Sequence, residues 1–360
     1  MARAPRVTVL MPVYDAEPFL RDAIESVRRQ SWTDFELLIV DDGSRDGSGA
    51  IADAHAGADA RVRVEHVAHG GLVAALNLGL ERIQTELIAR ADADDVNRPD
   101  RLARQIAFLD AHPDVGVCGS WIRLLPAGSV WRLPGRWDAL HAMLLFGAPF
   151  YHSTVVMRRD WIARGGARYD PAFAHAEDYD FWERAARQTR FANIATALVR
   201  YRCHPGQVSE VNRTAQGAAS RAIRRRQLLA LGITPTAAEL QLHEDLVAVR
   251  CGLTRARLDA GAAWLERLRG ANRATGRYPE PAFTRTLALH WYRNCAEGVS
   301  GGEPAAAAAF AASPLAAALP DARRYVARLR LLRALSSGFA RGVARLTVRR
   351  RARLGRRSRA

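Results

Sequence analysis

Short blocks of apolar residues alternate with helical patterns along the first half of the chain. Segments such as Leu37-Leu38-Ile39-Val40 are apolar at consecutive positions, which is typical of strands covered on both faces. Between these blocks apolar residues recur at the spacing of amphipathic helices. The predicted strands are Val7–Met11, Phe35–Val40, Val62–His66, Leu87–Ala91 and Val115–Leu124, and the predicted helices are Pro18–Gln30, Gly47–Ala56, Leu72–Ile83 and Pro99–Ala111. This alternation predicts an α/β fold with a mostly parallel central sheet and helices on both faces.

The pattern becomes less regular after Trp137 and mainly helical after Asn212. The further predicted elements are the helix Asp138–Phe146, the strand Thr154–Arg158, the helix Glu177–Ala186, the strand Ala195–Tyr201, and the helices Arg221–Leu231, Ala237–Val249 and Thr254–Leu268. We therefore expect three parts: a sheet domain over residues 1–212, a C-terminal helical extension over 213–320 and a tail over 321–360.

The composition is that of a globular protein, with 49% hydrophobic and 25% charged residues. The formal net charge of +16 is concentrated in residues 321–360, which hold 14 Arg and one acidic residue. The rest of the chain is close to neutral. An anionic partner is therefore expected for the tail and not for the body.

The tail also carries a regular apolar stripe. Its members are Tyr325, Leu329, Leu332, Phe339, Val343 and Leu346. A basic amphipathic helix of this kind is typical of segments that bind an anionic membrane surface. The alternative is a helix docked on the body and followed by an Arg-rich end. Nucleic acid is an unlikely partner, because no binding module accompanies the Arg-rich run.

Four cysteines are widely spaced and form no Cys-x-x-Cys pair, so we expect reduced thiols. The N-terminal residues lack the pattern of a signal peptide, and no uncharged apolar run is long enough to span a bilayer. We therefore expect a cytoplasmic protein. Because of the basic tail, we further expect a peripheral position on the inner face of the cytoplasmic membrane.

Two acidic clusters follow two of the predicted strands. Asp41-Asp42-Gly43-Ser44 comes after Phe35–Val40, and Asp92-Ala93-Asp94-Asp95 comes after Leu87–Ala91. In doubly wound sheets, ligands bind outside the carboxyl ends of the strands. Closely spaced carboxylates repel one another unless a cation compensates, and Mg²⁺ or Mn²⁺ binds carboxylates together with substrate phosphates. The pair of clusters predicts a metal-bound diphosphate; the alternatives are a capped turn and a solvated acidic loop.

Two common phosphate-binding motifs are missing. The first strand is followed by Pro12-Val13-Tyr14-Asp15-Ala16-Glu17, which contains none of the glycines of a dinucleotide-binding turn. A phosphate-binding loop of the Gly-x-x-x-x-Gly-Lys type is also excluded, because the chain contains no Lys.

A longer series of motifs resembles the family 2 glycosyltransferases. The matching segments, in the order of the family, are Val7-Thr8-Val9-Leu10-Met11-Pro12-Val13-Tyr14, Gln30-Ser31-Trp32, Phe35 to Ser44, Ala75-Leu76-Asn77-Leu78-Gly79, Arg90 to Asp95, Pro99-Asp100-Arg101-Leu102, Ala176 to Trp182, and Tyr201 to Ser209. The resemblance covers about residues 5–212 and implies the GT-A fold, a Rossmann-like sheet, with inverting chemistry.

The resemblance implies roles for residues on the donor side. Pro12, Tyr14 and Glu17 would line the nucleotide pocket, and Asp41 or Asp42 would contact the base or ribose. Asp92 and Asp94 form the Asp-x-Asp element that holds the ribose and a Mg²⁺ or Mn²⁺ ion, and Asp95 would share the metal. Leu76 stands where many relatives carry Arg, so one basic contact to the donor is missing.

The resemblance also implies roles on the acceptor side. Asp178 matches the acid that acts as general base on the acceptor hydroxyl, with Asp180 as the competing candidate and a helix N-cap as the structural alternative. Gln207 and Ser209 match a Gln-x-Ser element near the diphosphate. Two further residues are candidates for the diphosphate or the acceptor, His204 and Trp182, each with ordinary hydrogen bonding or core packing as the alternative.

These observations together indicate a metal-dependent hexosyltransferase. We expect it to move a sugar from a nucleotide-sugar, preferably a UDP-sugar, to a hydroxyl of a glycan or lipid-linked acceptor in cell-surface polysaccharide synthesis. Two other hypotheses stay open. The chain could be a non-catalytic relative that binds nucleotide-sugars, or an adaptor whose basic tail attaches it to membranes.

Overall fold

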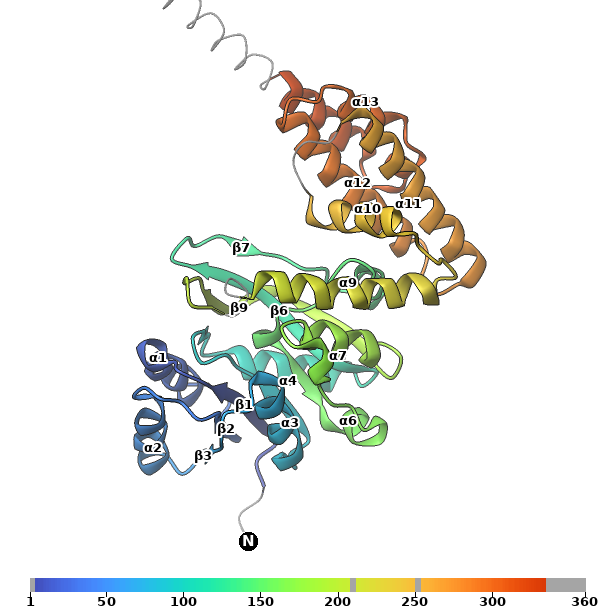
Figure 1. Cartoon of the computed structure of the whole chain (residues 1–360). Coiled ribbons are helices and arrows are strands. Elements are labelled where there is room, and N and C mark those ends of the chain that lie inside the picture. Colours follow the sequence, from blue (N-terminus) through green and yellow to red (C-terminus); the bar gives the residue numbers. More distant parts are fainter. Residues whose placement is uncertain (1–3, 208–211, 250–253, 335–360) are drawn as a thin grey trace, which may run out of the picture. The chain divides into compact units, whose positions relative to one another are not determined.

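The computed structural model describes residues 4–207, 212–249 and 254–334, and the chain divides into two compact units (Figure 1). The first unit covers residues 1–224 and the second covers residues 225–360. Their boundary lies inside the helix α9 (Arg213–Ala230).

The first unit is built on one sheet, and half of this sheet is parallel. The strands β1 (Val7–Val13), β2 (Phe35–Asp41), β3 (Val62–His66) and β4 (Leu87–Arg90) lie in the order β3-β2-β1-β4. Every pairing among these four strands is parallel. Their carboxyl ends therefore meet at one edge of the sheet, which is where the two acidic clusters begin.

The sheet continues beyond β4 with mixed pairing. The added strands are β5 (Val96–Asn97), β6 (Val115–Leu125), β7 (Val130–Trp131), β8 (Val156–Arg158) and β9 (Arg190–Arg202). β8 is antiparallel to both β4 and β6, whereas β6 and β9 are parallel. The short strands β5 and β7 are absent from the sequence prediction, and β9 begins earlier than expected.

Helices cover both faces of this sheet, which confirms the predicted fold class (Figure 1). One face packs against α1 (Glu17–Arg28), α2 (Ser48–Ala58) and α4 (Arg101–Ala111). The other face packs against α3 (Leu72–Arg82), α5 (Trp137–Met143), α6 (Arg159–Gly165) and α7 (Glu177–Ala185). Along β1, Val9 and Met11 belong to the first core and Leu10 to the second, as the alternation of a strand requires.

The second unit is helical. Its helices include α10 (Ala237–Ala248), α11 (Arg255–Thr275), α12 (Ala282–Ser300) and α13 (Ala305–Ala312), and α12 packs against the other three. A capping box starts α10, because Thr236 and Glu239 satisfy each other's backbone amides. No helix in the described part of the chain has the length and apolar content that crossing a membrane requires.

The predicted tail helix is described only at its beginning, over residues 322–334. Leu329 is buried there, and the ring of Tyr325 meets that of Tyr292 at 4.8 Å. The start of the apolar stripe thus packs within the second unit. Phe339, Val343 and Leu346 lie outside the described residues.

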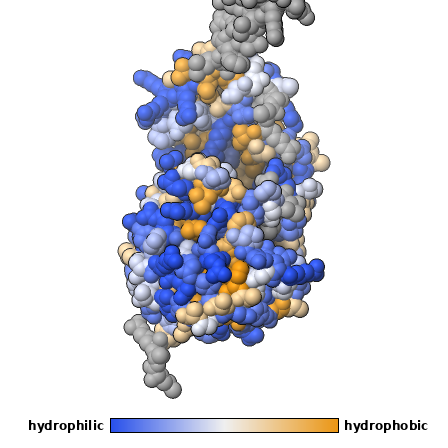
Figure 2. Space-filling view, turned by 90° about the vertical axis from the view of Figure 1, so that its left-hand side faces the viewer, coloured by the Kyte–Doolittle hydropathy of each residue, from blue (hydrophilic) through white to orange (hydrophobic). Residues whose placement is uncertain are grey.

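Hydrophilic side chains cover most of the face shown in Figure 2, and the hydrophobic ones form small separate patches. The apolar residues are instead gathered in the two cores on either side of the sheet. The hollows of the first unit are the candidate sites described below.

Candidate functional site

A cleft of about 520 Å³ opens at the carboxyl ends of β1, β2 and β4. Seven of the residues singled out in the sequence line it: Pro12, Tyr14, Asp42, Asp92, Asp94, His204 and Gln207. The two core layers leave this edge of the sheet free for loops, which explains why polar side chains gather there.

One end of the cleft presents a fixed carboxylate beside two aromatic rings. The Asp42 carboxylate accepts hydrogen bonds from the backbone amides of Gly70 and Gly71, both at 2.8 Å. The rings of Tyr14 and His69 stack with centroids 4.1 Å apart. Gly43 allows the loop after β2 to lie close to His69, because its φ is +72° and a Cβ at this position would lie 2.8 Å from the His69 backbone nitrogen. A planar, hydrogen-bonding group such as a nucleobase suits this end.

Two predicted nucleotide contacts, Asp41 and Glu17, do not line the cleft. The Asp41 carboxylate accepts a hydrogen bond from the Ser44 amide and lies 2.8 Å from His66 Nδ1. The Glu17 carboxylate accepts a hydrogen bond from the Gly47 amide at 2.8 Å. Both side chains therefore hold the loop after β2 in place.

The acidic cluster lies at the other end of the cleft, between β4 and β5. Asp92, Asp94 and Asp95 each place a carboxylate oxygen within 4.8 Å of the others. Burial and the Asp92 carboxylate raise the pKa of Asp94, and burial with the charges of Asp92 and Asp94 raises the pKa of Asp95. An all-oxygen donor set with crowded negative charge fits a hard divalent cation such as Mg²⁺ or Mn²⁺.

The three carboxylates are not equivalent. Both oxygens of Asp95 are already engaged: one accepts a hydrogen bond from Ser153 Oγ at 2.7 Å and the other from the Arg202 amide at 3.0 Å. Asp95 is 1% exposed, whereas the side chains of Asp92 and Asp94 are 29% and 28% exposed. Asp92 and Asp94 are therefore better placed to contact a ligand, and Asp95 ties the loop to β9.

Arg90 belongs to the cleft although the sequence analysis assigns it no role. Its guanidinium is 3% exposed and pairs with the Asp92 carboxylate at 2.5 Å, and its Nε has no hydrogen-bond partner among the described residues. A buried cation needs an anionic partner. Its position two residues before Asp92, within the motif from Arg90 to Asp95, is the signal that could have identified it.

Asp178 lies in the first turn of α7 and is not among the residues that line the cleft, although the charge of Asp92 acts on it. Burial, then the charges of Glu177 and Asp92, raise the pKa of Asp178 to about 7, opposed by the hydrogen bond from the Tyr179 amide and by Arg90. The competing candidate, Asp180, is fully buried, and its carboxylate pairs with Arg184 at 2.7 Å. Asp178 is therefore the more accessible of the two carboxylates.

The remaining predicted residues lie in different surroundings. His204 Nε2 is 3.0 Å from the Asp94 carboxylate, and Gln207 accepts a hydrogen bond from the His204 amide at 2.9 Å. Trp182 is fully buried and its ring meets that of Phe150 at 5.1 Å, so it does not line the cleft. Ser209 lies outside the described residues.

Comparisons with known proteins agree with this geometry. A family model described as "Glycosyl transferase family 2" matches residues 8–165. The putative glycosyltransferase EpsE of Bacillus subtilis (strain 168) is 32% identical over 217 residues, which are 56% of this chain and 74% of that protein. The amylovoran biosynthesis glycosyltransferase AmsE of Erwinia amylovora is 30% identical over 210 residues, 56% of this chain and 78% of that protein.

The fold also resembles a solved structure. The crystal structure of S. aureus TarS 1–349 in complex with UDP-GlcNAc matches with a TM-score of 0.54 and 16% sequence identity, covering 94% of this chain and 92% of that chain. At this identity the likeness concerns the fold alone, and it confirms the predicted GT-A architecture.

Proposed function

The chain belongs to glycosyl transferase family 2, and from this premise we propose that it is an inverting, metal-dependent enzyme that uses a nucleotide-sugar donor. The acceptor is a hydroxyl of a glycan or a lipid-linked sugar, in cell-surface polysaccharide synthesis. The observation that carries the proposal is that one cleft joins Tyr14 and Asp42 to the carboxylates of Asp92 and Asp94.

The nucleotide is proposed to occupy the end of the cleft near Tyr14 and Asp42. The Asp42 carboxylate, held by two backbone amides, is ready to accept hydrogen bonds from a base or ribose. A UDP-sugar is preferred, because the structurally similar TarS was crystallised with UDP-GlcNAc. The role in polysaccharide synthesis is supported by the amylovoran biosynthesis relative.

The diphosphate is proposed to lie at the acidic end, where Asp92 and Asp94 would hold Mg²⁺ or Mn²⁺. When bound, the metal neutralises charge that develops on the departing nucleoside diphosphate. Arg90 holds the Asp92 carboxylate by its ion pair, and His204 is within hydrogen-bond reach of Asp94. Gln207 orients the His204 backbone at the rim of the cleft.

Asp178 is proposed to take the proton from the acceptor hydroxyl. A pKa of about 7 leaves a substantial fraction of this carboxylate ionised at neutral pH and able to accept a proton. Attack by the hydroxyl on the sugar from the side opposite the leaving diphosphate inverts the anomeric centre, and no covalent enzyme intermediate is needed.

The enzyme is proposed to act in the cytoplasm at the inner face of the membrane, with residues 321–360 contacting anionic lipids. We keep the expected three-part division of the chain, with the sheet domain in residues 1–212, as part of this proposal.

A thermal-shift experiment tests the donor site. UDP with Mn²⁺ at a hundredfold excess over Kd should raise the melting temperature of the wild type by roughly 5–10 °C. GDP and dTDP are measured for comparison with UDP, and Asp94→Ala is the control variant. The proposal requires that the shift depend on Mn²⁺ and disappear in Asp94→Ala; a folded wild type that responds to none of the nucleotides contradicts it.

A further inference from the structure

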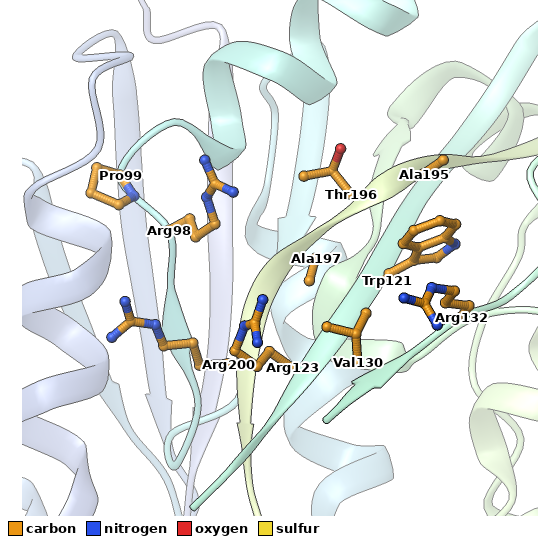
Figure 3. A pocket seen from close by; sticks show the side chains of 10 residues that line it. All are labelled: Arg98, Pro99, Trp121, Arg123, Val130, Arg132, Ala195, Thr196, Ala197 and Arg200. Atoms are coloured by element: carbon orange, nitrogen blue, oxygen red, sulfur yellow. The ribbon is translucent and has the colours of Figure 1, made fainter. Parts of the chain in front are cut away.

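A second hollow lies apart from the cleft, on strands β5, β6, β7 and β9 of the first unit (Figure 3). Its volume is about 430 Å³. Four arginines, Arg98, Arg123, Arg132 and Arg200, line it together with the indole of Trp121. We call it the arginine pocket.

The positive charge of this pocket is largely uncompensated. Arg98 pairs with Asp100 at 2.9 Å, but Asp100 also pairs with Arg104 at 2.5 Å. Among the residues that the structure describes, Arg123 donates a hydrogen bond to the Gly128 backbone oxygen at 2.7 Å and forms no ion pair with a carboxylate. Within residues 4–207, 212–249 and 254–334, neither Arg132 nor Arg200 forms an ion pair with a carboxylate. The residues that line the hollow therefore include four arginines and no acid, and the one carboxylate paired with them, that of Asp100, is shared with Arg104.

The strand register brings these charges together at a cost. Arg123 of β6 is the direct neighbour of Arg200 on β9, and like charges at such positions destabilise a sheet. Arg98 follows β5, whose Val96 is the other neighbour of Arg200. Figure 3 shows Arg123 between Arg200 and the pair formed by Trp121 and Arg132. An anion bound among these groups would offset the repulsion.

The kind of anion follows from the lining. Guanidinium groups bind phosphate through paired N–H donors, and several uncompensated cations match the charge of a phosphate or diphosphate better than that of a single carboxylate. The Arg132 guanidinium lies 5.4 Å from the Trp121 ring centroid, so the pocket also offers an aromatic wall. A phosphate attached to a sugar uses both features.

The arginine pocket is connected to the acidic cluster through two strands. β5 begins directly after Asp95, and the Arg202 amide of β9 donates to the Asp95 carboxylate. Arg200 precedes Arg202 by two residues on the same face of β9, about 7 Å along an extended strand. The arginine pocket is therefore built on the same strand that holds the acidic loop in place.

We propose that the arginine pocket binds a phosphate group of the acceptor and thereby selects phosphate-bearing acceptors. This inference rests on the proposed glycosyltransferase function, because it assigns a chemical class to the acceptor of that reaction. The phosphate could be supplied by a lipid-linked sugar diphosphate or by the phosphodiester of a glycan chain.

Binding of defined probes to the full-length protein tests this proposal. The probes are farnesyl-diphospho-N-acetylglucosamine, a glycerol phosphate oligomer and the neutral octyl N-acetylglucosaminide. The wild type should bind at least one phosphate-bearing probe about tenfold more tightly than the neutral probe. The double variant Arg123→Gln and Arg200→Gln should weaken this binding roughly tenfold, to the affinity of the neutral probe, and leave the neutral probe unchanged. The probe that responds identifies the source of the phosphate.

Two controls make the outcome decisive. Arg164→Gln removes another exposed guanidinium, from α6 and outside both hollows, and should leave all probe affinities unchanged. The Mn²⁺-dependent UDP shift is recorded on the same samples. If wild type and double variant bind the phosphate probes equally while both keep the UDP shift, the arginine pocket is refuted and the proposed function stands; loss of the UDP shift in the wild type refutes the proposed function itself.

Discussion

Burial and the neighbouring charge of Glu177 raise the pKa of Asp178 to about 7. If Asp178 is the general base, transfer should rise with pH along a limb with an apparent pKa near 7. Asp178→Asn should reduce kcat by roughly 10²–10⁴-fold and remove that limb. Release of nucleoside diphosphate, measured from pH 5 to 9, checks both effects. An unchanged pH profile in Asp178→Asn would assign the base to another residue.

The same carboxyl makes a prediction about stability. Because the folded-state pKa of Asp178 is raised, its contribution to stability is present below the unfolded-state pKa of about 4 and is lost as pH rises through about 7. Asp178→Asn should therefore be more stable than the wild type at pH 8, by roughly 1–3 kcal/mol, and the difference should be smaller at pH 5. Urea unfolding at both pH values measures the difference, and equal midpoints at pH 8 would count against it.

At the scale of elements, the loop between β4 and β5 carries two acids in different surroundings. Asp95 is buried and holds the loop in place, whereas Asp94 lines the cleft. Asp95→Ala leaves Ser153 Oγ and the Arg202 amide without their acceptor, and it should cost roughly 1–3 kcal/mol in the free energy of unfolding. Asp94→Ala removes a partly exposed carboxylate and should cost less, while abolishing the Mn²⁺-dependent UDP shift. Urea unfolding of the two variants side by side checks the ranking.

The sequence predicts some elements well for a physical reason. β1, β2 and β3 are continuous or alternating apolar runs between clear turn signals, and their predicted positions agree with the structure. β5 and β7 have two residues each, too few to show a period. α12 does carry a period, because Phe283, Leu287, Trp291 and Cys295 recur every four residues, yet the sequence analysis assigns no helix there.

The residues of the candidate site also divide into those that the sequence predicts and those that it does not. The acidic clusters are contiguous in sequence, so their place at the strand ends can be predicted. The environment of Trp182 depends on the packing of distant segments, and no local pattern reveals it, whereas Arg90 stands in the same motif as its partner Asp92. The arginine pocket is even harder to predict from the sequence, because Arg98, Arg123 and Arg200 become neighbours only through the pairing of β5, β6 and β9.

At the scale of the whole molecule, the basic tail and the donor cleft should be separable. The described start of the tail packs within the second unit through Leu329 and Tyr325, so a truncation after Ala334 keeps these contacts. The truncated protein should lose binding to phosphatidylglycerol vesicles and keep its UDP shift, because each Arg near an anionic surface contributes about 1 kcal/mol. Vesicle sedimentation at low and high salt measures this, with phosphatidylcholine vesicles as the neutral control. Undiminished sedimentation would place membrane binding elsewhere in the chain.

The hydrogen bond between the Arg202 amide and Asp95 ties β9, which lines the arginine pocket, to the acidic loop beside the cleft. A ligand in one hollow that restricts the motion of β9 would lower the entropic cost of binding a ligand in the other hollow. If the acceptor strengthens donor binding in this way, thermodynamic reciprocity requires the donor to strengthen acceptor binding by the same factor. The enzyme would hold a nucleotide-sugar most firmly when an acceptor is already in place, which protects the activated sugar from wasteful loss to water.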